Sequence, residues 1–243
     1  MESFEHVADE YDTARPSYPR ELFDALGSLR GLKTLDAGAG SGIATRALNE
    51  RGAMVTALDP GAALLEIARL RQSGLSCVIA DAAAMPFRDH SFDLVCFAQF
   101  WHWVDPSSRC EEVHRILVPG GRWAGWWSHA RADGEHWFDE HWDLVESACP
   151  RANRRQRDID WGSTVADSEM FDVAELVRLP WQRHIETDDW RTDLASHSYI
   201  AALSDSAREQ LLDDLIGVAK SHFRDGHMAI DYETWLWVAT RRP

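Results

Sequence analysis

An acidic residue and three alternate glycines stand where an apolar run of the chain gives way to a helical pattern. The acid is Asp36, and the glycines are Gly38, Gly40 and Gly42. Glycine adopts positive φ and lets a ligand approach the backbone because it lacks a Cβ, and a helix start offers free N–H groups. A dinucleotide turn requires G-x-G-x-x-G, whereas an acid before the first glycine suits a cationic ligand group. The turn alone leaves both ligand classes open.

Two further acids follow strand-like apolar segments later in the chain. Asp59 comes 17 residues after Gly42, and Asp81 is followed by Ala82. An acid at the end of a second strand accepts hydrogen bonds from both hydroxyls of a ribose, in NAD and in S-adenosylmethionine alike. Asp81 suits the amino group of an adenine, with the N–H of Ala82 beside it. Each acid also fits a helix cap, which is compatible with ligand binding.

His102 is the residue best suited to proton transfer, because imidazole titrates near neutral pH. It lies three residues past Gln99, between Trp101 and Trp103. The sequence therefore predicts His102 as a general base or a contact to the substrate. A packed helix start, with His102 bonded to the backbone, fits the same residues, and both interpretations stay open at this point.

Apolar segments alternate with helical patterns in the first half of the chain, which is typical of a doubly wound parallel sheet with helical crossovers. In such sheets ligands bind at the carboxyl ends of the strands. Two later apolar segments predict an antiparallel edge. The expected strands cover residues 33–36, 53–58, 75–80, 91–97, 122–127, 175–185 and 228–240. The expected helices include 21–29, 42–51, 62–71, 105–116, 135–148 and 205–223, with a loop over 150–162.

The charge balance limits the classes of partner. A formal net charge of −15 disfavours nucleic acid, whose phosphates bind basic surfaces, and an anionic membrane surface. No apolar stretch approaches the roughly 20 residues of a membrane span. The four cysteines form no C-x-x-C pair, so we expect free thiols and no metal site. We predict a cytoplasmic protein, a monomer or homodimer, that acts on a small molecule.

Three motifs in the first half of the chain carry a resemblance to a known family. The run DAAAMPFRDHSFDLV over 81–95 resembles the D-x-x-x-(L/M)-P-F-x-D-x-S-F-D-x-V signature of class I S-adenosylmethionine-dependent methyltransferases. The run RILVPGG over 115–121 is similar to the turn before their fifth strand, and LDAGAGSG over 35–42 is similar to their first motif. The motifs come in the family's order and spacing over residues 33–128.

The resemblance implies a Rossmann-like α/β fold. Its doubly wound seven-stranded sheet would have the order 3-2-1-4-5-7-6, with strand 7 antiparallel and helices on both faces. It further implies a single methyltransferase domain over residues 1–243. Within that domain, residues 1–30 would form a helical lid over cofactor and substrate, and residues 135–225 would contain helical and loop elaborations that roof the substrate pocket.

Carried over by position, the resemblance also assigns residues to the cofactor S-adenosyl-L-methionine, whose product is S-adenosyl-L-homocysteine. The methionine moiety would be held by Asp36, Gly38, Gly40 and Ala98, the ribose by Asp59, and the adenine by Asp81 and Ala82.

Residues 11–19 and 98–103 resemble a smaller branch that includes trans-aconitate-type and related small-molecule methyltransferases. In that branch the N-terminal helix covers the cofactor. Tyr11 would then pack on the sulfonium or bond the methionine carboxylate, and Arg15 would pair with the same carboxylate, a geometry that suits its planar guanidinium.

The abundance of aromatic residues points to a flat acceptor, because the chain has 12 tryptophans and many of them follow the central strands. The candidate acceptor contacts are Tyr18, Trp101, Trp127 and Tyr199. We therefore expect methylation of N or O on a planar (hetero)aromatic compound, as in bacterial secondary metabolism. The alternatives are carboxyl O-methylation of a small organic acid, which the scarcity of arginine in these motifs disfavours, and a non-catalytic cofactor-binding subunit.

Overall fold

The structure is a computed structural model that describes residues 17–172 and 174–243. These residues form two compact units. The sheet unit comprises Ser17–Ser128, Asp160–Leu179 and Thr234–Pro243, and the helical unit comprises residues 129–159 and 180–233. Most of the elaboration expected over 135–225 falls within the helical unit. The extent of a single domain and of the N-terminal lid stay predictions, since the lid begins outside the described residues.

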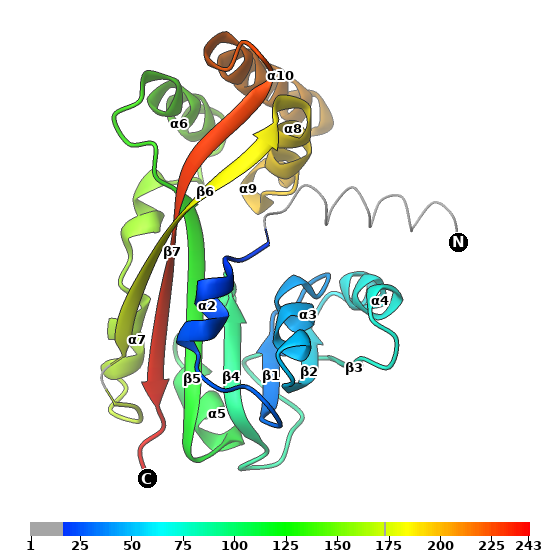
Figure 1. Ribbon diagram of the computed structural model, residues 1–243, viewed down its shortest axis with the longest axis vertical. Coiled ribbons are helices and arrows are strands. Elements are labelled where there is room, and N and C mark those ends of the chain that lie inside the picture. The colour runs from blue at the N-terminus through cyan, green and yellow to red at the C-terminus, as the bar shows by residue number, and fades with distance from the viewer. Residues whose placement is uncertain (1–16, 173) are drawn as a thin grey trace. The chain divides into compact units, whose positions relative to one another are not determined.

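Seven strands form one mixed sheet in the order β3-β2-β1-β4-β5-β7-β6, which confirms the expected order. β1 lies parallel between β2 and β4, and β5 lies parallel beside β4. The arrows in Figure 1 show β7 running opposite to β5, as expected for strand 7. The strands are β1 (Lys33–Ala37), β2 (Met54–Asp59), β3 (Ser76–Ile79), β4 (Phe92–Ala98), β5 (Leu117–Ala130), β6 (Glu175–Glu186) and β7 (His227–Thr240).

The helices lie close to the expected positions, with three differences. The helix expected over 21–29 ends at Ala25. The segment after β4 forms a short 3-10 helix, and α5 begins later than expected because Asp105 Oδ1 accepts the N–H of Ser107 at 2.9 Å and holds a turn before it. The expected loop over 150–162 contains a second 3-10 helix and the start of α7, where Asp160 Oδ1 accepts the N–H of Gly162 at 3.0 Å. The helices are α2 (Arg20–Ala25), α3 (Ile43–Glu50), α4 (Ala62–Arg71), η1 (Trp101–Trp103), α5 (Arg109–Ile116), α6 (His136–Ala148), η2 (Arg154–Asp158), α7 (Trp161–Ala166), α8 (Thr187–Ala195), α9 (Ser198–Ala201) and α10 (Asp205–His222).

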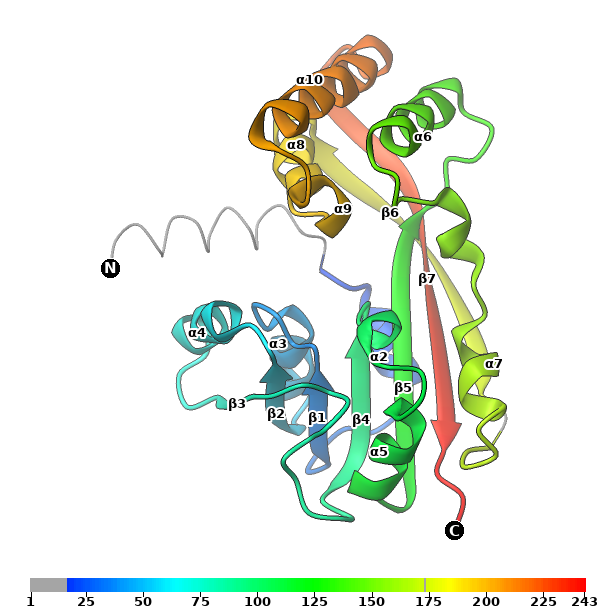
Figure 2. The same ribbon diagram turned by 180° about the vertical axis from the view of Figure 1, so that it is seen from behind.

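Successive side chains of a strand point to opposite faces of the sheet, and helices cover both faces, so the centre of the sheet is buried on both sides. In β4, Val95 and Phe97 pack in one apolar cluster, whereas Leu94 and Cys96 pack in another. Residues of α5 and α7 join the first cluster, and residues of α2 and α3 join the second. Figure 2 shows the face of the sheet that α5 covers. The two layers hold the carboxyl ends of β1, β2 and β4 in a fixed arrangement.

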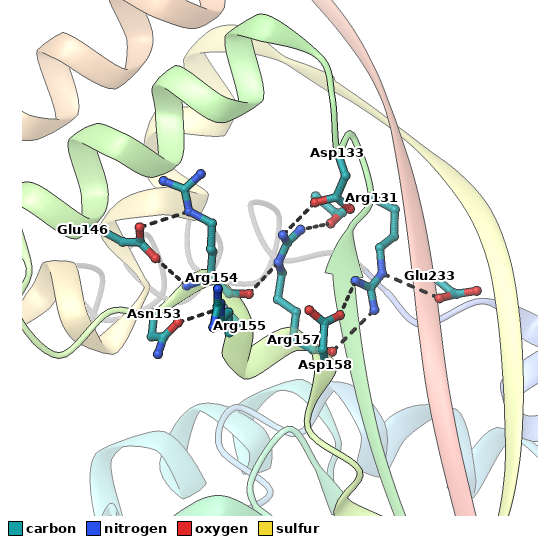
Figure 3. A network of polar contacts seen from close by, with 10 residues as sticks. Arg131, Asp133, Glu146, Asn153, Arg154, Arg155, Arg157, Asp158 and Glu233 are labelled. Atoms are coloured by element: carbon teal, nitrogen blue, oxygen red, sulfur yellow. Dashed lines mark hydrogen bonds and ion pairs between the residues drawn. The ribbon is translucent and has the colours of Figure 1, made fainter.

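Arginines fasten the segment before α7 to the end of β5 within the helical unit (Figure 3). Arg157 is buried and donates to the carbonyl oxygen of Ala130 at 2.9 Å and to Asp133 Oδ1 at 2.8 Å. Arg131 donates to Asp158 Oδ1 at 2.9 Å. These arginines therefore serve the local structure of this segment.

Two sequence expectations concern the chain as a whole. Cys77, Cys96, Cys110 and Cys149 are free thiols, as expected. Within the described ranges, none of the helices combines the length and the apolar composition that a bilayer span requires.

His141 is an uncharged histidine in the core of the helical unit. Its ring lies nearly parallel to that of Phe138, with ring centroids 6.1 Å apart, and 6.1 Å from the ring of Trp190. Burial, with smaller contributions from the nearby charges of His197 and Arg154, lowers the pKa of His141 to about 3. The folded chain therefore resists protonation of this residue.

We expect this residue to make the protein less stable in acid. The unfolded chain binds the proton with a pKa near 6.5, so the stability is full above that pH and falls as the pH drops toward the folded-state value. His141 should account for a loss on the order of 2 kcal/mol between pH 7 and pH 5. Urea unfolding at both pH values measures it. His141→Phe should remove this loss and His184→Phe, at an exposed histidine, should keep it; an equal pH dependence in all three proteins would contradict the assignment.

Candidate functional site

The turn after β1 adopts the left-handed backbone that its glycines allow. Gly38, Gly40 and Gly42 have φ values of 77°, 56° and 85°. The N–H groups of Gly38 and Ala39 donate to the carbonyl oxygen of Leu58 at 2.8 and 3.0 Å, which ties the turn to the end of β2. Gly42 directly precedes α3. The predicted strand, turn and helix are thus present, and positive φ at all three positions explains the glycines.

Asp36 is completely buried at the end of β1, where it is only partly satisfied. Its Oδ2 accepts the hydroxyl of Thr45, on the first turn of α3, at 2.5 Å. Among the described residues, no group donates to Oδ1. Burial raises the pKa of Asp36, hydrogen bonding to Thr45 opposes that rise, the charge of Asp59 adds to it, and the net result is a pKa of about 6. A buried carboxylate oxygen without a partner is costly, so this position suits a ligand that brings a positive charge.

Asp59 binds the backbone of two turns at once. Its Oδ2 accepts the N–H of Gly40 at 2.9 Å, and its Oδ1 accepts the N–H of Gly61, just before α4, at 2.7 Å. The side chain therefore fixes the glycine turn beside the start of α4. Each carboxylate oxygen can accept a second hydrogen bond, so the turn-fixing role remains compatible with the expected ribose contact.

The predicted adenine contacts lie on the turn after β3. Asp81 is exposed, and its Oδ1 accepts the N–H of Ala83 at 2.8 Å. Ala82 is buried among core residues that include Met85. Among the described residues, the turn engages only Oδ1 of Asp81, so the other carboxylate oxygen suits a ligand amino group.

Phe100 lies directly against the glycine turn. A Cβ built on Gly38 would stand 2.0 Å from Cγ of Phe100, so no larger residue fits there. The chain reaches this position through Ala98, the last residue of β4, and through Gln99, which has a φ of 55° and donates its N–H to Trp126. Left-handed backbone is uncommon for a residue other than glycine. The contact joins the end of β4 to the expected methionine subsite.

His102 stands among three tryptophan rings of the sheet unit. The centroids of Trp103, Trp127 and Trp161 lie 5.1, 6.2 and 5.9 Å from its own. The indole N–H of Trp127 donates to His102 Nδ1 at 3.4 Å. Burial against these rings, with a smaller contribution from the charge of Arg109, lowers the pKa of His102 to about 4, although part of the residue is exposed to solvent. The imidazole is therefore neutral near pH 7.

Two predicted acceptor contacts have mainly structural surroundings. Trp101 has no exposed surface, and its indole N–H donates to Thr164 Oγ1 at 3.3 Å. That position makes Trp101 part of the core, because an acceptor cannot reach a fully covered side chain, and we omit it from the proposed site. Tyr18 is half-buried and packs edge-on against Trp126 and Phe23, with centroids 5.7 and 6.4 Å away.

The other predicted contacts belong to the helical unit or lie outside the described residues. Tyr199 belongs to the helical unit, where its hydroxyl lies 2.7 Å from Nδ1 of His197 and burial raises its pKa. Tyr11 and Arg15 lie outside the described residues. The structure adds Thr45 and Trp161, which no motif indicated: Thr45 is recognisable only by its bond to Asp36, and Trp161 only by its ring contacts.

Comparison with known proteins gives consistent results. The model of the family described as "Methyltransferase domain" matches residues 35–124. The chain is 31% identical over 221 residues to an uncharacterized methyltransferase of Mycobacterium tuberculosis, covering 90% of this chain and 86% of that protein. It is 45% identical over 103 residues to a ubiquinone biosynthesis O-methyltransferase of Azotobacter vinelandii, covering 39% and 43%. A solved structure of a candidate type II methyltransferase from Anaeromyxobacter dehalogenans superposes with a TM-score of 0.69 at 23% identity, covering 94% and 97%, which shows a shared fold.

We expect the binding of S-adenosylmethionine, the cofactor inferred from the sequence, to release a proton from Asp36. A cationic ligand favours the carboxylate, whereas in the free protein Asp36 has a pKa of about 6 and is largely protonated at pH 5. Affinity should therefore rise about tenfold from pH 5 to pH 7. Isothermal titration calorimetry in buffers of different ionisation enthalpy measures both the affinity and the proton.

Two variants test whether Asp36 is the group that titrates. Asp36→Asn should weaken binding and remove the pH dependence, and Thr45→Val should move the midpoint to higher pH because it deletes a bond that favours the carboxylate. In the free protein, the stability from Asp36 is full below pH 3.8 and lost as the pH rises through about 6. Asp36→Asn should thus be more stable at pH 8, by on the order of 3 kcal/mol at most. Unchanged proton release in Asp36→Asn would assign the proton elsewhere.

Proposed function

Because the chain belongs to the methyltransferase family, we propose that it transfers the methyl group of S-adenosyl-L-methionine to a nitrogen or oxygen of a planar (hetero)aromatic small molecule. Family membership makes it a methyltransferase enzyme, and the nature of the acceptor is the proposal. The observation that carries it is the group of His102, Trp103, Trp127 and Trp161 beyond the end of β4, which we call the aromatic cluster. Trp103 is 60% exposed, which is unusual for so large an apolar side chain.

The residues around the glycine turn fit the cofactor. Asp36, with one buried oxygen unpartnered among the described residues, would face its positive charge, together with the backbone at Gly38 and Gly40. Asp59 would accept the ribose hydroxyls, and the turn at Asp81 would hold the adenine. Tyr11 and Arg15 stay proposed contacts to the methionine carboxylate.

The protein's contribution to catalysis is positional. When bound, the cofactor supplies a sulfonium methyl that an acceptor lone pair attacks, while the C–S bonding electrons stay on sulfur. The chain needs to align the acceptor with that methyl group and keep water away. A proton carried by the acceptor atom leaves to water unless a base takes it. Because Phe100 contacts the glycine turn, an acceptor aligned with the methyl group would lie next to the segment from Phe100 to Trp103.

A carboxylic acid is the second acceptor class. A carboxylate acceptor would need a guanidinium group that is available to bind it. Among the described residues, Arg109 lies next to the aromatic cluster, but it is buried. It donates to the carbonyl oxygen of Trp101 at 3.1 Å and faces the Trp101 ring at 4.6 Å. The name of the Azotobacter vinelandii relative, an O-methyltransferase of ubiquinone biosynthesis, agrees better with an aromatic acceptor. A non-catalytic subunit is disfavoured because the acids and glycines of the cofactor site are all present.

Other expectations about the protein's setting stay predictions. These are secondary metabolism, a cytoplasmic location, a monomeric or homodimeric state, and the absence of nucleic-acid partners.

Acceptor binding tests the proposal. With the protein saturated by S-adenosylhomocysteine, tryptophan fluorescence should be quenched by flat heterocycles such as hydroxyquinolines and not by polycarboxylates such as aconitate. With S-adenosylmethionine, mass spectrometry should detect a methylated product only from the flat series. Methylation of aconitate at a comparable kcat/KM would replace the proposal with the acid alternative. Calorimetric binding of NAD in place of the cofactor would refute both.

A further inference from the structure

We propose that His102 is a specificity-determining residue that donates a hydrogen bond from Nε2 to a ring-bound oxygen of the acceptor. The acceptor would lie flat against the exposed face of Trp103, and its oxygen would be a carbonyl or phenolate. This inference rests on the proposed function, because it refines the class of flat acceptor at the same site. It replaces the expectation that His102 acts as a general base.

The tautomer of His102 follows from its neighbour. The indole nitrogen of Trp127 is a donor only, and it approaches His102 Nδ1 at 3.4 Å. Nδ1 must therefore be the unprotonated nitrogen, and Nε2 of the neutral ring carries the proton. A base at Nε2 would need the opposite tautomer, in which two N–H groups face each other between Trp127 and His102. The ring is thus preset to donate.

The charge state supports the same role. The surrounding rings and Arg109 hold the pKa of His102 to about 4, so the imidazole is neutral across the physiological range. A group with so low a pKa is a weak proton acceptor at pH 7. A neutral N–H donor prefers an oxygen acceptor and gives no advantage to a cationic ligand.

The surface beside this donor is flat and apolar. Trp103 presents 60% of its surface, with its ring 5.1 Å from that of His102 and tilted by 40°. Trp127 and Trp161, which also contact the imidazole, stack on each other with centroids 5.1 Å apart and planes 17° apart. One fixed donor beside an open indole face recognises a planar ring by stacking and its oxygen by a hydrogen bond.

The position in the chain links this surface to the transfer site. Phe100 lies on Gly38 of the glycine turn, and η1 begins with the next residue. His102 and Trp103 therefore follow within three residues of a contact to the expected methionine subsite. An acceptor held by this segment would lie next to the cofactor.

Two amide substitutions separate the possible roles of His102. Asparagine places an amide near the position of Nδ1 and can accept from Trp127, whereas glutamine extends an amide N–H toward the position of Nε2. The probes are 4-quinolone, which carries a ring-bound oxygen, and naphthalene, which has a similar flat shape and no hydrogen-bond acceptor. Tryptophan fluorescence in the presence of S-adenosylhomocysteine measures both dissociation constants. Wild type should prefer 4-quinolone by about tenfold, since removing one hydrogen bond from a formed site costs on this scale.

The preference should survive in His102→Gln and disappear in His102→Asn, with affinity for S-adenosylhomocysteine unchanged in both. His184→Asn, at an exposed histidine of the helical unit, is the control and should match wild type. If His102→Asn keeps the preference, the residue is only structural and the inference fails. If both variants lose kcat on a flat acceptor that the wild type methylates, while the preference for 4-quinolone stays, His102 acts as a base.

A measurement on the wild-type protein is independent of how the variants fold. Nitrogen-15 NMR of the histidine side chains should find His102 with a proton on Nε2 and none on Nδ1 from pH 8 down to about pH 5. A proton on Nδ1 would overturn the inference. Methyl transfer to flat acceptors that lack a ring-bound oxygen, with the same KM in His102→Asn as in wild type, would overturn the inference about His102. The proposed function would then remain intact. Transfer only to non-planar acceptors would overturn both.

Discussion

The buried carboxylate of Asp36 is the constraint on which the site depends. It has no exposed surface, and among the described residues only its Oδ2 is hydrogen-bonded, to Thr45, so the free protein bears the cost of a poorly solvated acid. The fold tolerates that cost because apolar clusters on both faces of the sheet hold β1 between β2 and β4. An acid in such a place favours ligands that neutralise it, which turns an unfavourable local interaction into selectivity for a cation. The glycine turn and Asp59, which binds its backbone, fix the backbone next to Asp36.

The tryptophans divide between structure and recognition in a way that composition does not reveal. Trp101, Trp123 and Trp126 are fully covered, and they fill the layers that carry β4 and β5. Trp103 follows Trp101 by two residues and is mostly exposed. The short helix η1 accounts for the contrast, because it turns one indole into the core and the other outward. The exposed indole is the one that carries the proposal for the acceptor.

Hydrophobic periodicity and glycine spacing are local signals, and they predicted the strands and the acids at the strand ends. The strand order was implied by the resemblance to the methyltransferase family. Asp36, Asp59 and Asp81 all lie where the motifs placed them. What the sequence could not predict depends on contacts between distant segments. The tautomer of His102 depends on Trp127, 25 positions away, and the cluster is closed by Trp161, which lay in an expected loop. Trp161 begins α7, and Asp160 before it is a recognisable N-cap residue. The polar, arginine-rich residues around Asp160 favoured the prediction of a loop.

The contact between Phe100 and Gly38 has an evolutionary consequence. Position 38 is restricted twice, by its left-handed backbone and by the ring that covers it, whereas position 100 is restricted only by the space it fills. Substitutions at the two positions are therefore not interchangeable during divergence. Phe100 can be replaced by a smaller side chain, which changes the surface beside the glycine turn. A larger residue at position 38 cannot compensate for that replacement. Substitution at this contact is therefore expected at position 100, two residues after β4, and not at position 38 in the turn after β1.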